Sequence, residues 1–238
     1  LAHFGIGHLA GAIGGSLGGM QVLQWVIDYP DDISAAVVVC ASSRLSAQNI
    51  AFSAVAREAI MRDPDFQNGD YYGTGRSPDT GLTIARMMAH ITYLSEASMR
   101  EKFGRRLQHG EEPRFAFDVD FQVESYLQHQ GEAFLKRFDA NTYLYMTRVM
   151  DYFDVFADPA AVGALLEKSD TRFLVVSFDS DWRFDTEHSR EIVRHLQSWR
   201  VPVTFREIES PWGHDSFLLA VPEYLRTVEA FLGRAASD

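Results

Sequence analysis

The stretch GGSLGGM, residues 14–20, stands at the junction between a short apolar segment and a helical pattern. Residues 9–14 are small and apolar, as in a buried strand, whereas apolar residues from Met20 to Ile27 recur at spacings of three and four until Pro30. Gly-x-Ser-x-Gly at such a turn is typical of a nucleophile elbow, because residues without a Cβ atom let the chain turn tightly enough to expose the serine hydroxyl. The stretch predicts Ser16 as a nucleophile; the alternative is a glycine-rich turn in which this serine only caps the helix.

The segments that follow the elbow predict a strand-helix-strand unit and then a long helical region. Residues 33–40 are apolar on both faces, which favours a strand covered by helices on each side. We therefore assign residues 1–45 to an α/β core. From residue 46 to 167 the apolar residues follow helical periodicity, with no convincing strand. This region, 46–167, is predicted to be a helical cap inserted into the core.

Strand and helix alternation resumes after the cap. Residues 173–176 have the composition of a buried strand, and residues 203–205 are predicted to form another strand after an intervening helical pattern. A last helix is expected from about Asp215 to Leu232. Residues 168–238 are therefore predicted to complete the core. The predicted fold class is α/β, with a mostly parallel sheet, helices on both faces and a large helical insertion.

A serine nucleophile needs a base, and the base needs a carboxylate that orients it. In folds with this elbow the order along the chain is serine, acid, histidine, with the last two on loops after later strands. Asp181 and His214 occupy such positions, and Asp179 competes with Asp181 for the acid role. The backbone N–H of Leu17 is predicted to stabilise the oxyanion from the positive end of the helix after the elbow.

The composition excludes several classes of function. Lys and Arg total 22 against 33 acidic residues, a formal charge of −11, which argues against a nucleic-acid binder that relies on a basic surface. The single cysteine, Cys40, excludes an internal disulfide and a cysteine-based zinc cluster, and no metal site is predicted. No apolar run approaches the roughly 18 residues needed to cross a bilayer. We expect a cytoplasmic protein without a nucleic-acid or membrane partner.

Longer strings extend the match beyond the elbow. The elbow continues into Gln21 and is followed by Trp25 and Tyr29-Pro30. With these strings the chain resembles the homoserine O-acyltransferases of the α/β-hydrolase superfamily over nearly its whole length. The other matching strings are LSAQNIAF at 45–52, Gly81-Leu82 through Ala85-Arg86, HITYLS at 90–95, FQVESYL at 121–127, RFDANTY at 137–143, SDWRF at 180–184 and GHD at 213–215.

This resemblance implies a role for individual residues. Ser16 is implied to accept an acyl group from an acyl-CoA, with His214 as the base and Asp181, rather than Asp179, as its orienting acid. Three further residues are implied to bind the amino acid acceptor: Arg86 its carboxylate, Asp215 its ammonium group, and Tyr93 as part of the pocket. A guanidinium and a carboxylate suit a zwitterionic acceptor. For Arg86 the alternative is an ion pair on a helix surface.

The resemblance also implies the reaction and its setting. It implies transfer of an acyl group to the hydroxyl of L-homoserine in methionine biosynthesis, by a homodimer, with acyl-CoA as co-substrate and no bound cofactor. The strings at 45–52 and 121–127 look most like members that use succinyl-CoA, and other members use acetyl-CoA. A cap of the predicted size suits this chemistry, because a buried, dry passage would keep water from the acyl-enzyme.

Other functions remain open at this point. Some relatives acylate serine instead of homoserine, and an esterase or thioesterase would share the triad and the fold. A non-catalytic α/β protein is a further alternative, although it would not need Ser16, Asp181 and His214 together.

Members of the family carry the first strands of the sheet and a second oxyanion donor before the elbow. Because only 15 residues precede Ser16, we expect these 238 residues to be an N-terminally truncated member that is poorly stable and weakly active alone.

Overall fold

The computed structural model of the chain describes residues 1–235, which form two compact units. The first unit contains Leu1–Arg44 and the residues from Phe153 onward, and the second contains Leu45–Tyr152. The prediction of an α/β core with a helical insertion is confirmed. The insertion, however, ends at Tyr152 rather than at 167, because the helix α7 (Pro159–Leu166) packs with the core unit.

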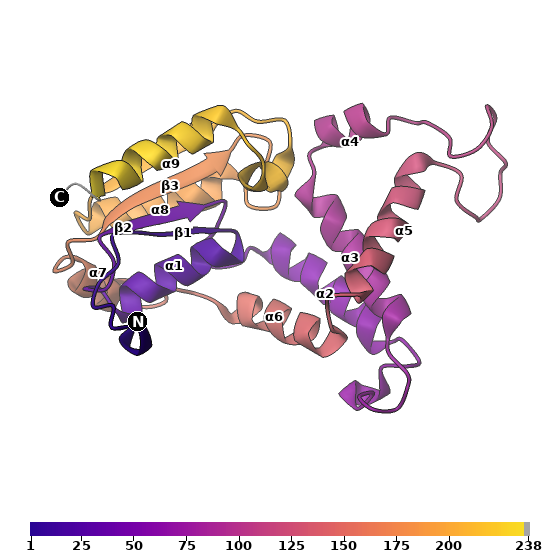
Figure 1. The fold of residues 1–238 in the computed structure, drawn as a ribbon, viewed down its shortest axis with the longest axis horizontal. Coiled ribbons are helices and arrows are strands. Elements are labelled where there is room, and N and C mark those ends of the chain that lie inside the picture. Colours follow the sequence, from indigo (N-terminus) through magenta and orange to yellow (C-terminus); the bar gives the residue numbers. More distant parts are fainter. Residues whose placement is uncertain (236–238) are drawn as a thin grey trace. The chain divides into compact units, whose positions relative to one another are not determined.

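The first unit is built around a parallel four-stranded sheet (Figure 1). Its strands follow one another in chain order: β1 (Ala12–Gly15), β2 (Ala35–Val39), β3 (Arg172–Phe178) and β4 (Val203–Ile208). Every residue of β2 is fully buried. An apolar strand of this kind is stable only between two helical layers, which explains why its sequence does not alternate.

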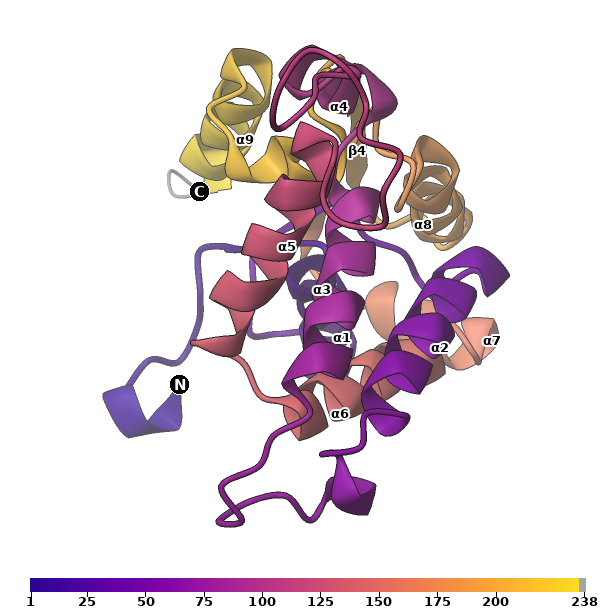
Figure 2. The same cartoon turned by 90° about the vertical axis from the view of Figure 1, so that its right-hand side faces the viewer.

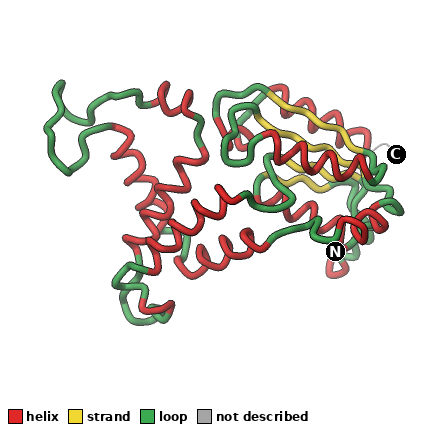
Figure 3. The backbone as a smooth tube through the Cα atoms, turned by 180° about the vertical axis from the view of Figure 1, so that it is seen from behind, coloured by secondary structure: helices red, strands yellow, loops and turns green. Residues whose placement is uncertain are grey.

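Helices cover both faces of this sheet, as Figure 3 shows. On one face, the helix α9 (Pro222–Ala235) packs through Tyr224 and Phe231 against a cluster that includes Val37 and Val39. On the other face, Gly19 of α1 (Leu17–Asp28) lies against Val38. The remaining helical elements of the unit are η1 (Ala2–Phe4), α8 (Thr186–Ser198) and η3 (Gly213–Leu218).

Two predicted boundaries are wrong. The first strand begins at Ala12 instead of residue 9, and Leu9 contributes only an isolated bridge to Ile33. The predicted last helix is divided into η3 and α9. The second helix starts at Pro222, whose ring lacks a backbone N–H and is therefore well placed in the first turn of a new helix.

The second unit consists of helices alone. In chain order it contains α2 (Ala47–Met61), η2 (Gln67–Gly69), α3 (Asp79–Tyr93), α4 (Glu96–Lys102), α5 (Gln122–Leu135) and α6 (Ala140–Tyr152). Figure 2 shows α3 between α2 and α5. A buried ion pair of 2.6 Å between Arg57 and Asp151 joins α2 to α6, so that two charges are neutralised inside the helical unit.

The two chain segments that lead into and out of the helical unit are paired with each other in the core. Arg44 and Asp154 form an isolated antiparallel bridge, and the N–H of Val155 donates to the carbonyl oxygen of Ser43 at 3.0 Å. The insertion therefore leaves and re-enters the first unit at one place.

Candidate active site

Ser16 occupies a strained position at the end of β1. Its φ of 57° and ψ of −123° form a combination that residues with a Cβ atom rarely adopt. The turn depends on glycine, because a Cβ atom on Gly14 would overlap the carbonyl oxygen of Gly18. Leu17 is the first residue of α1, where backbone N–H groups have no acceptor within the helix. The structure therefore has the geometry expected of a nucleophile elbow.

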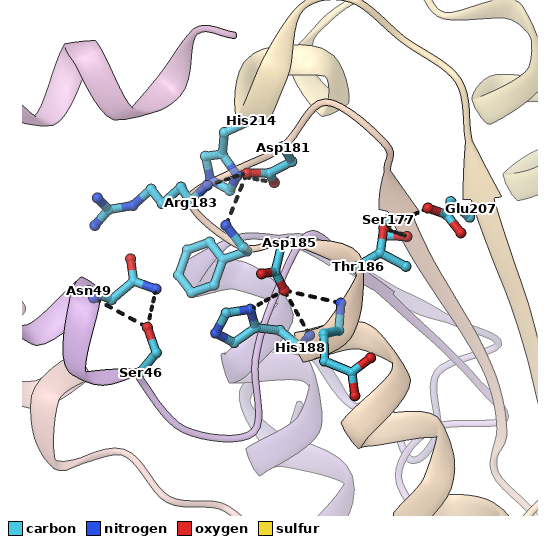
Figure 4. A network of polar contacts seen from close by, with 12 residues as sticks. Ser46, Asn49, Ser177, Asp181, Arg183, Asp185, Thr186, His188, Glu207 and His214 are labelled. Carbon is cyan, nitrogen blue, oxygen red and sulfur yellow. Dashed lines mark hydrogen bonds and ion pairs between the residues drawn. The ribbon is translucent and has the colours of Figure 1, made fainter. Parts of the chain in front are cut away.

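His214 and Asp181 form a buried hydrogen-bonded pair, shown in Figure 4. Nδ1 of His214 lies 2.7 Å from Oδ2 of Asp181. The other carboxylate oxygen, Oδ1, accepts the backbone N–H groups of Arg183 and Phe184, both at 3.0 Å. Since a carboxylate only accepts hydrogen bonds, Nδ1 carries the proton and Nε2 of the neutral imidazole is the nitrogen that can take up another.

Asp179 has a different partner. Its Oδ1 accepts the backbone N–H of Ser210 at 2.9 Å, so this carboxylate ties the loop after β3 to the loop after β4. Ser180 adds to the connection, because its hydroxyl donates to the carbonyl oxygen of Ser210 and accepts the N–H of Gly213. The structure thus places Asp181, and not Asp179, against His214, and it fixes the two loops to each other.

The histidine loop also packs over the elbow. Phe217 of η3 lies against Gly15, where a Cβ atom would overlap the phenyl ring. The same ring lies 5.4 Å from the imidazole of His214 between centroids. One aromatic side chain therefore contacts both the residue before Ser16 and the base. Asp215, the residue after His214, is partly buried in η3.

Arg86 and Tyr93 lie on α3 in the second unit, seven residues apart and hence on one face of the helix. The guanidinium of Arg86 lies over the rings of Tyr93 and Phe134, at 5.4 and 4.8 Å from their centroids. Its Nε atom is buried, and no carboxylate of residues 1–235 pairs with it. The alternative of a surface ion pair therefore has no partner in the described part of the chain.

His90 lies one turn after Arg86 on α3. It was placed in the cap from the sequence and assigned no function, but its side chain is buried, with 6% of its surface exposed. Its Nε2 lies 2.6 Å from the hydroxyl of Tyr126. Burial lowers the pKa of His90 to about 4, and the charges of Arg86 and Lys102 act in the same direction. Two sequence signals linked His90 to the candidate site: its i, i+4 spacing from Arg86, and its position in the matching string HITYLS, which also contains Tyr93.

Replacing His90 by glutamine is expected to reduce the acid sensitivity of the protein. A histidine that stays neutral in the folded state disfavours protonation, so stability falls as the pH drops from about 6.5 to about 4, by at most about 3 kcal/mol. Denaturant unfolding at pH 7, 5.5 and 4 measures this loss. His129→Gln, at an exposed position on α5, is the matched control. Equal pH dependence in both variants would contradict the prediction.

Cys40 lies beside the hydrogen-bonded pair of His214 and Asp181, although no function was assigned to it from the sequence. Its Sγ, a carboxylate oxygen of Asp181 and a ring nitrogen of His214 all lie within 4.8 Å of one another. These atoms form a donor set that cations can use, but the hydrogen bond between the imidazole and the carboxylate already accounts for the closest approach. The signal available in the sequence was the position of Cys40 directly after the second strand.

Comparisons with known proteins agree with this architecture. The sequence model of the α/β-hydrolase fold family matches residues 1–221. The homoserine O-succinyltransferase of Magnetococcus marinus is 53% identical over 236 residues, which cover 97% of this chain and 60% of that protein. A homoserine O-acetyltransferase of Rhodopseudomonas palustris is also 53% identical, over 232 residues that cover 97% of this chain and 58% of that protein. The chain therefore spans about 60% of the length of these relatives.

Solved structures show the same fold in proteins with different names. A homoserine O-acetyltransferase from Bacillus anthracis superposes with a TM-score of 0.86 at 22% identity, over 97% of this chain and 61% of that one. The esterase E22 superposes with a TM-score of 0.84 at 21% identity, over 98% of this chain and 63% of the esterase chain. Among the described residues, no helix combines the length and the apolar character that a membrane span requires. The fold therefore accommodates transferases and esterases alike.

Proposed function

This chain belongs to the α/β-hydrolase fold family, and on that premise we propose that it carries the catalytic centre of an acyl-CoA-dependent homoserine O-acyltransferase. The observation that supports the proposal most directly is the buried hydrogen bond between His214 and Asp181, held next to the strained Ser16 by Phe217. Relatives that are 53% identical to this chain over the aligned residues are named homoserine O-succinyltransferase and homoserine O-acetyltransferase. The reaction would belong to methionine biosynthesis.

In the first step, Ser16 takes the acyl group from the thioester. Its Oγ attacks the carbonyl carbon while Nε2 of His214 takes the hydroxyl proton. The N–H of Leu17 donates to the oxyanion that forms, and Asp181 stabilises the imidazolium. The C–S bond then breaks, His214 returns the proton to sulfur, and CoA leaves as a thiol. The product is an acyl ester on Ser16.

In the second step, the acceptor hydroxyl replaces the serine. His214 takes the proton of this hydroxyl, the oxygen attacks the acyl-serine, and Ser16 regains the proton as it leaves. An acceptor with a carboxylate and an ammonium group needs one fixed cation and one fixed anion. We assign these roles to Arg86, whose charge has no carboxylate partner among residues 1–235, and to Asp215, with Tyr93 beside the guanidinium.

For the donor, we propose succinyl-CoA. The support is the resemblance of the strings at 45–52 and 121–127 to members that use it. Relatives with the succinyl name and with the acetyl name match this chain at almost the same identity, so their names alone do not separate the two donors. Turnover with each donor at equal concentration tests this choice, and a clear preference for acetyl-CoA would reverse it.

The test of the acceptor is whether CoA release depends on homoserine. Protein expressed from its complete reading frame is mixed with acyl-CoA, and free thiol is followed with and without L-homoserine. Steady release only in the presence of homoserine, with formation of an O-acyl product, is the expected result. The same rate without an acceptor would identify a thioesterase, and a preference for L-serine would identify a serine O-acyltransferase.

Replacing Arg86 by alanine is expected to raise the KM for homoserine by about 10- to 100-fold, as for the loss of a charged hydrogen-bonded contact of about 1.5–3 kcal/mol. Formation of the acyl-enzyme in a single turnover should keep its rate, because the first step does not involve the acceptor. Arg100→Ala, at an exposed position on α4, is the matched control. A loss confined to acyl-enzyme formation would refute the assignment of Arg86.

A further inference from the structure

Ser16, Cys40, Asp181 and His214 each follow the carboxyl end of a different strand of the sheet. Gly15 pairs with Val39 in the parallel register, so the next residues, Ser16 and Cys40, lie side by side at the ends of β1 and β2. The backbone continues this ladder: the N–H of Ser16 donates to Val39 and the N–H of Cys40 donates to Val176, both at 2.9 Å. Asp181 and His214 follow β3 and β4. Cys40 thus stands between the strand of the nucleophile and the strand of the acid.

The backbone at Cys40 is unusual in the same way as that at Ser16. Its φ is 48°, in the left-handed region that favours glycine. Backbone strain at a residue with a side chain persists where the surrounding structure requires it, and such residues cluster at functional sites. Cys40 is fully buried and its thiol is free of a disulfide. A glycine would adopt this backbone without strain, so the backbone conformation does not itself require a thiol at this position.

Sγ of Cys40 lies within 4.8 Å of a carboxylate oxygen of Asp181 and of a ring nitrogen of His214, so its S–H group is placed where it can donate to this carboxylate. That carboxylate is 2% exposed and already accepts one side-chain donor on Oδ2 and two backbone donors on Oδ1. A carboxylate has about four acceptor positions, so a thiol donor completes its set of partners. Burial raises the pKa of the Cys40 thiol, and the charge of Asp181 raises it further, which keeps the proton on sulfur.

We propose that Cys40 is a positioning residue, whose S–H group donates to the Asp181 carboxylate and fixes its rotation so that Oδ2 faces Nδ1 of His214. The residue acts through Asp181 and does not touch the substrate. A protonated thiol is a poor nucleophile and a poor metal ligand, which distinguishes this role from an acyl carrier or a cation site. The inference rests on the proposed roles of Ser16, Asp181 and His214.

The test compares variants that remove the donor with one that keeps it. Cys40→Ala and Cys40→Gly lose the thiol, and the glycine variant suits the left-handed backbone should alanine fail to fold. Cys40→Ser keeps an O–H donor of similar size. Val37→Ala removes buried atoms from the same core cluster and is the matched control for packing. All are made in the protein expressed from its complete reading frame.

Two readouts separate positioning from structure. The first is the low-field proton resonance of the His214–Asp181 hydrogen bond, which needs no turnover. The second is the rate at which a fluorophosphonate labels Ser16. We expect Cys40→Ala and Cys40→Gly to displace or lose the resonance and to slow labelling by about 10-fold, whereas Cys40→Ser and Val37→Ala keep both.

Each other outcome has a definite meaning. Parental resonance and labelling in Cys40→Ala or Cys40→Gly would overturn the positioning role, and so would equal loss in Cys40→Ser or Val37→Ala. If the parent protein is not labelled at Ser16 but the resonance still distinguishes the thiol-free variants from serine, the hydrogen bond from Cys40 stands and the proposed function fails.

Discussion

Replacing Ser16 by alanine is expected to reduce acyl transfer by about 10⁴- to 10⁶-fold. In the proposed mechanism this hydroxyl forms the covalent intermediate, and residues 14–20 contain no other hydroxyl side chain. The measurement is turnover of acyl-CoA with homoserine, together with mass spectrometry of the acylated protein. Both signals should disappear while the protein remains folded.

The strain at Ser16 provides a second readout. Because φ is 57° and ψ is −123° at this residue, Ser16→Gly removes a conformational cost of about 1–3 kcal/mol that a Cβ atom imposes. We expect Ser16→Gly to be as stable as the parent or more so in denaturant unfolding, although it is inactive. Ser42→Ala, at a buried serine outside the elbow, should retain activity. Activity that survives in Ser16→Ala would show that another residue is the nucleophile.

Replacing Asp181 by asparagine is expected to reduce turnover by about 10⁴-fold. An amide can still occupy the site, but its NH₂ group cannot accept the proton of Nδ1, so the imidazole is driven to the tautomer in which Nε2 carries the proton. That tautomer cannot act as a base toward Ser16. The substitution changes charge without changing size, and the two backbone N–H groups on Oδ1 can still be satisfied. The steady-state rate measures the effect.

Asp179→Asn is the matched control for this prediction. Its Oδ1 accepts a backbone N–H from Ser210, and an asparagine oxygen can accept the same hydrogen bond, so turnover should stay within a few-fold of the parent. The two residues are two positions apart in one loop and equal in charge. Losses of similar size in both variants would mean that the loop as a whole, rather than the contact with His214, sets the rate.

Features with strong local signals were predicted well from the sequence. The glycines around Ser16 allow one kind of turn, and the buried strand β2 is apolar throughout, so the elbow and the core followed from the residues themselves. Helical periodicity likewise indicated the insertion. The predicted end of the insertion was wrong because α7 also has helical periodicity, and periodicity does not tell a core helix from a cap helix.

Features set by tertiary contacts were beyond the sequence. Asp179 and Asp181 have the same chemistry, so their residue types did not separate them and only the family resemblance favoured Asp181. The folded loops show that Asp179 meets Ser210 and Asp181 meets His214. Cys40 and His90 were assigned no function from the sequence. Their partners, Asp181 and Tyr126, lie 141 and 36 positions further along the chain, and no local pattern connects residues that far apart.

Because Arg44 pairs with Asp154, the chain between these two residues starts and ends at a single point of the core unit. A segment whose two ends meet can be lengthened, shortened or exchanged as a module. Such a change leaves the strands before and after the segment in the same register and leaves the residues that follow each strand in place. The proposed catalytic residues Ser16, Asp181 and His214 all belong to the unit that contains the sheet, whereas Arg86, the proposed ligand of the acceptor carboxylate, belongs to the inserted segment, so an exchange of that segment would leave the three catalytic residues in the chain.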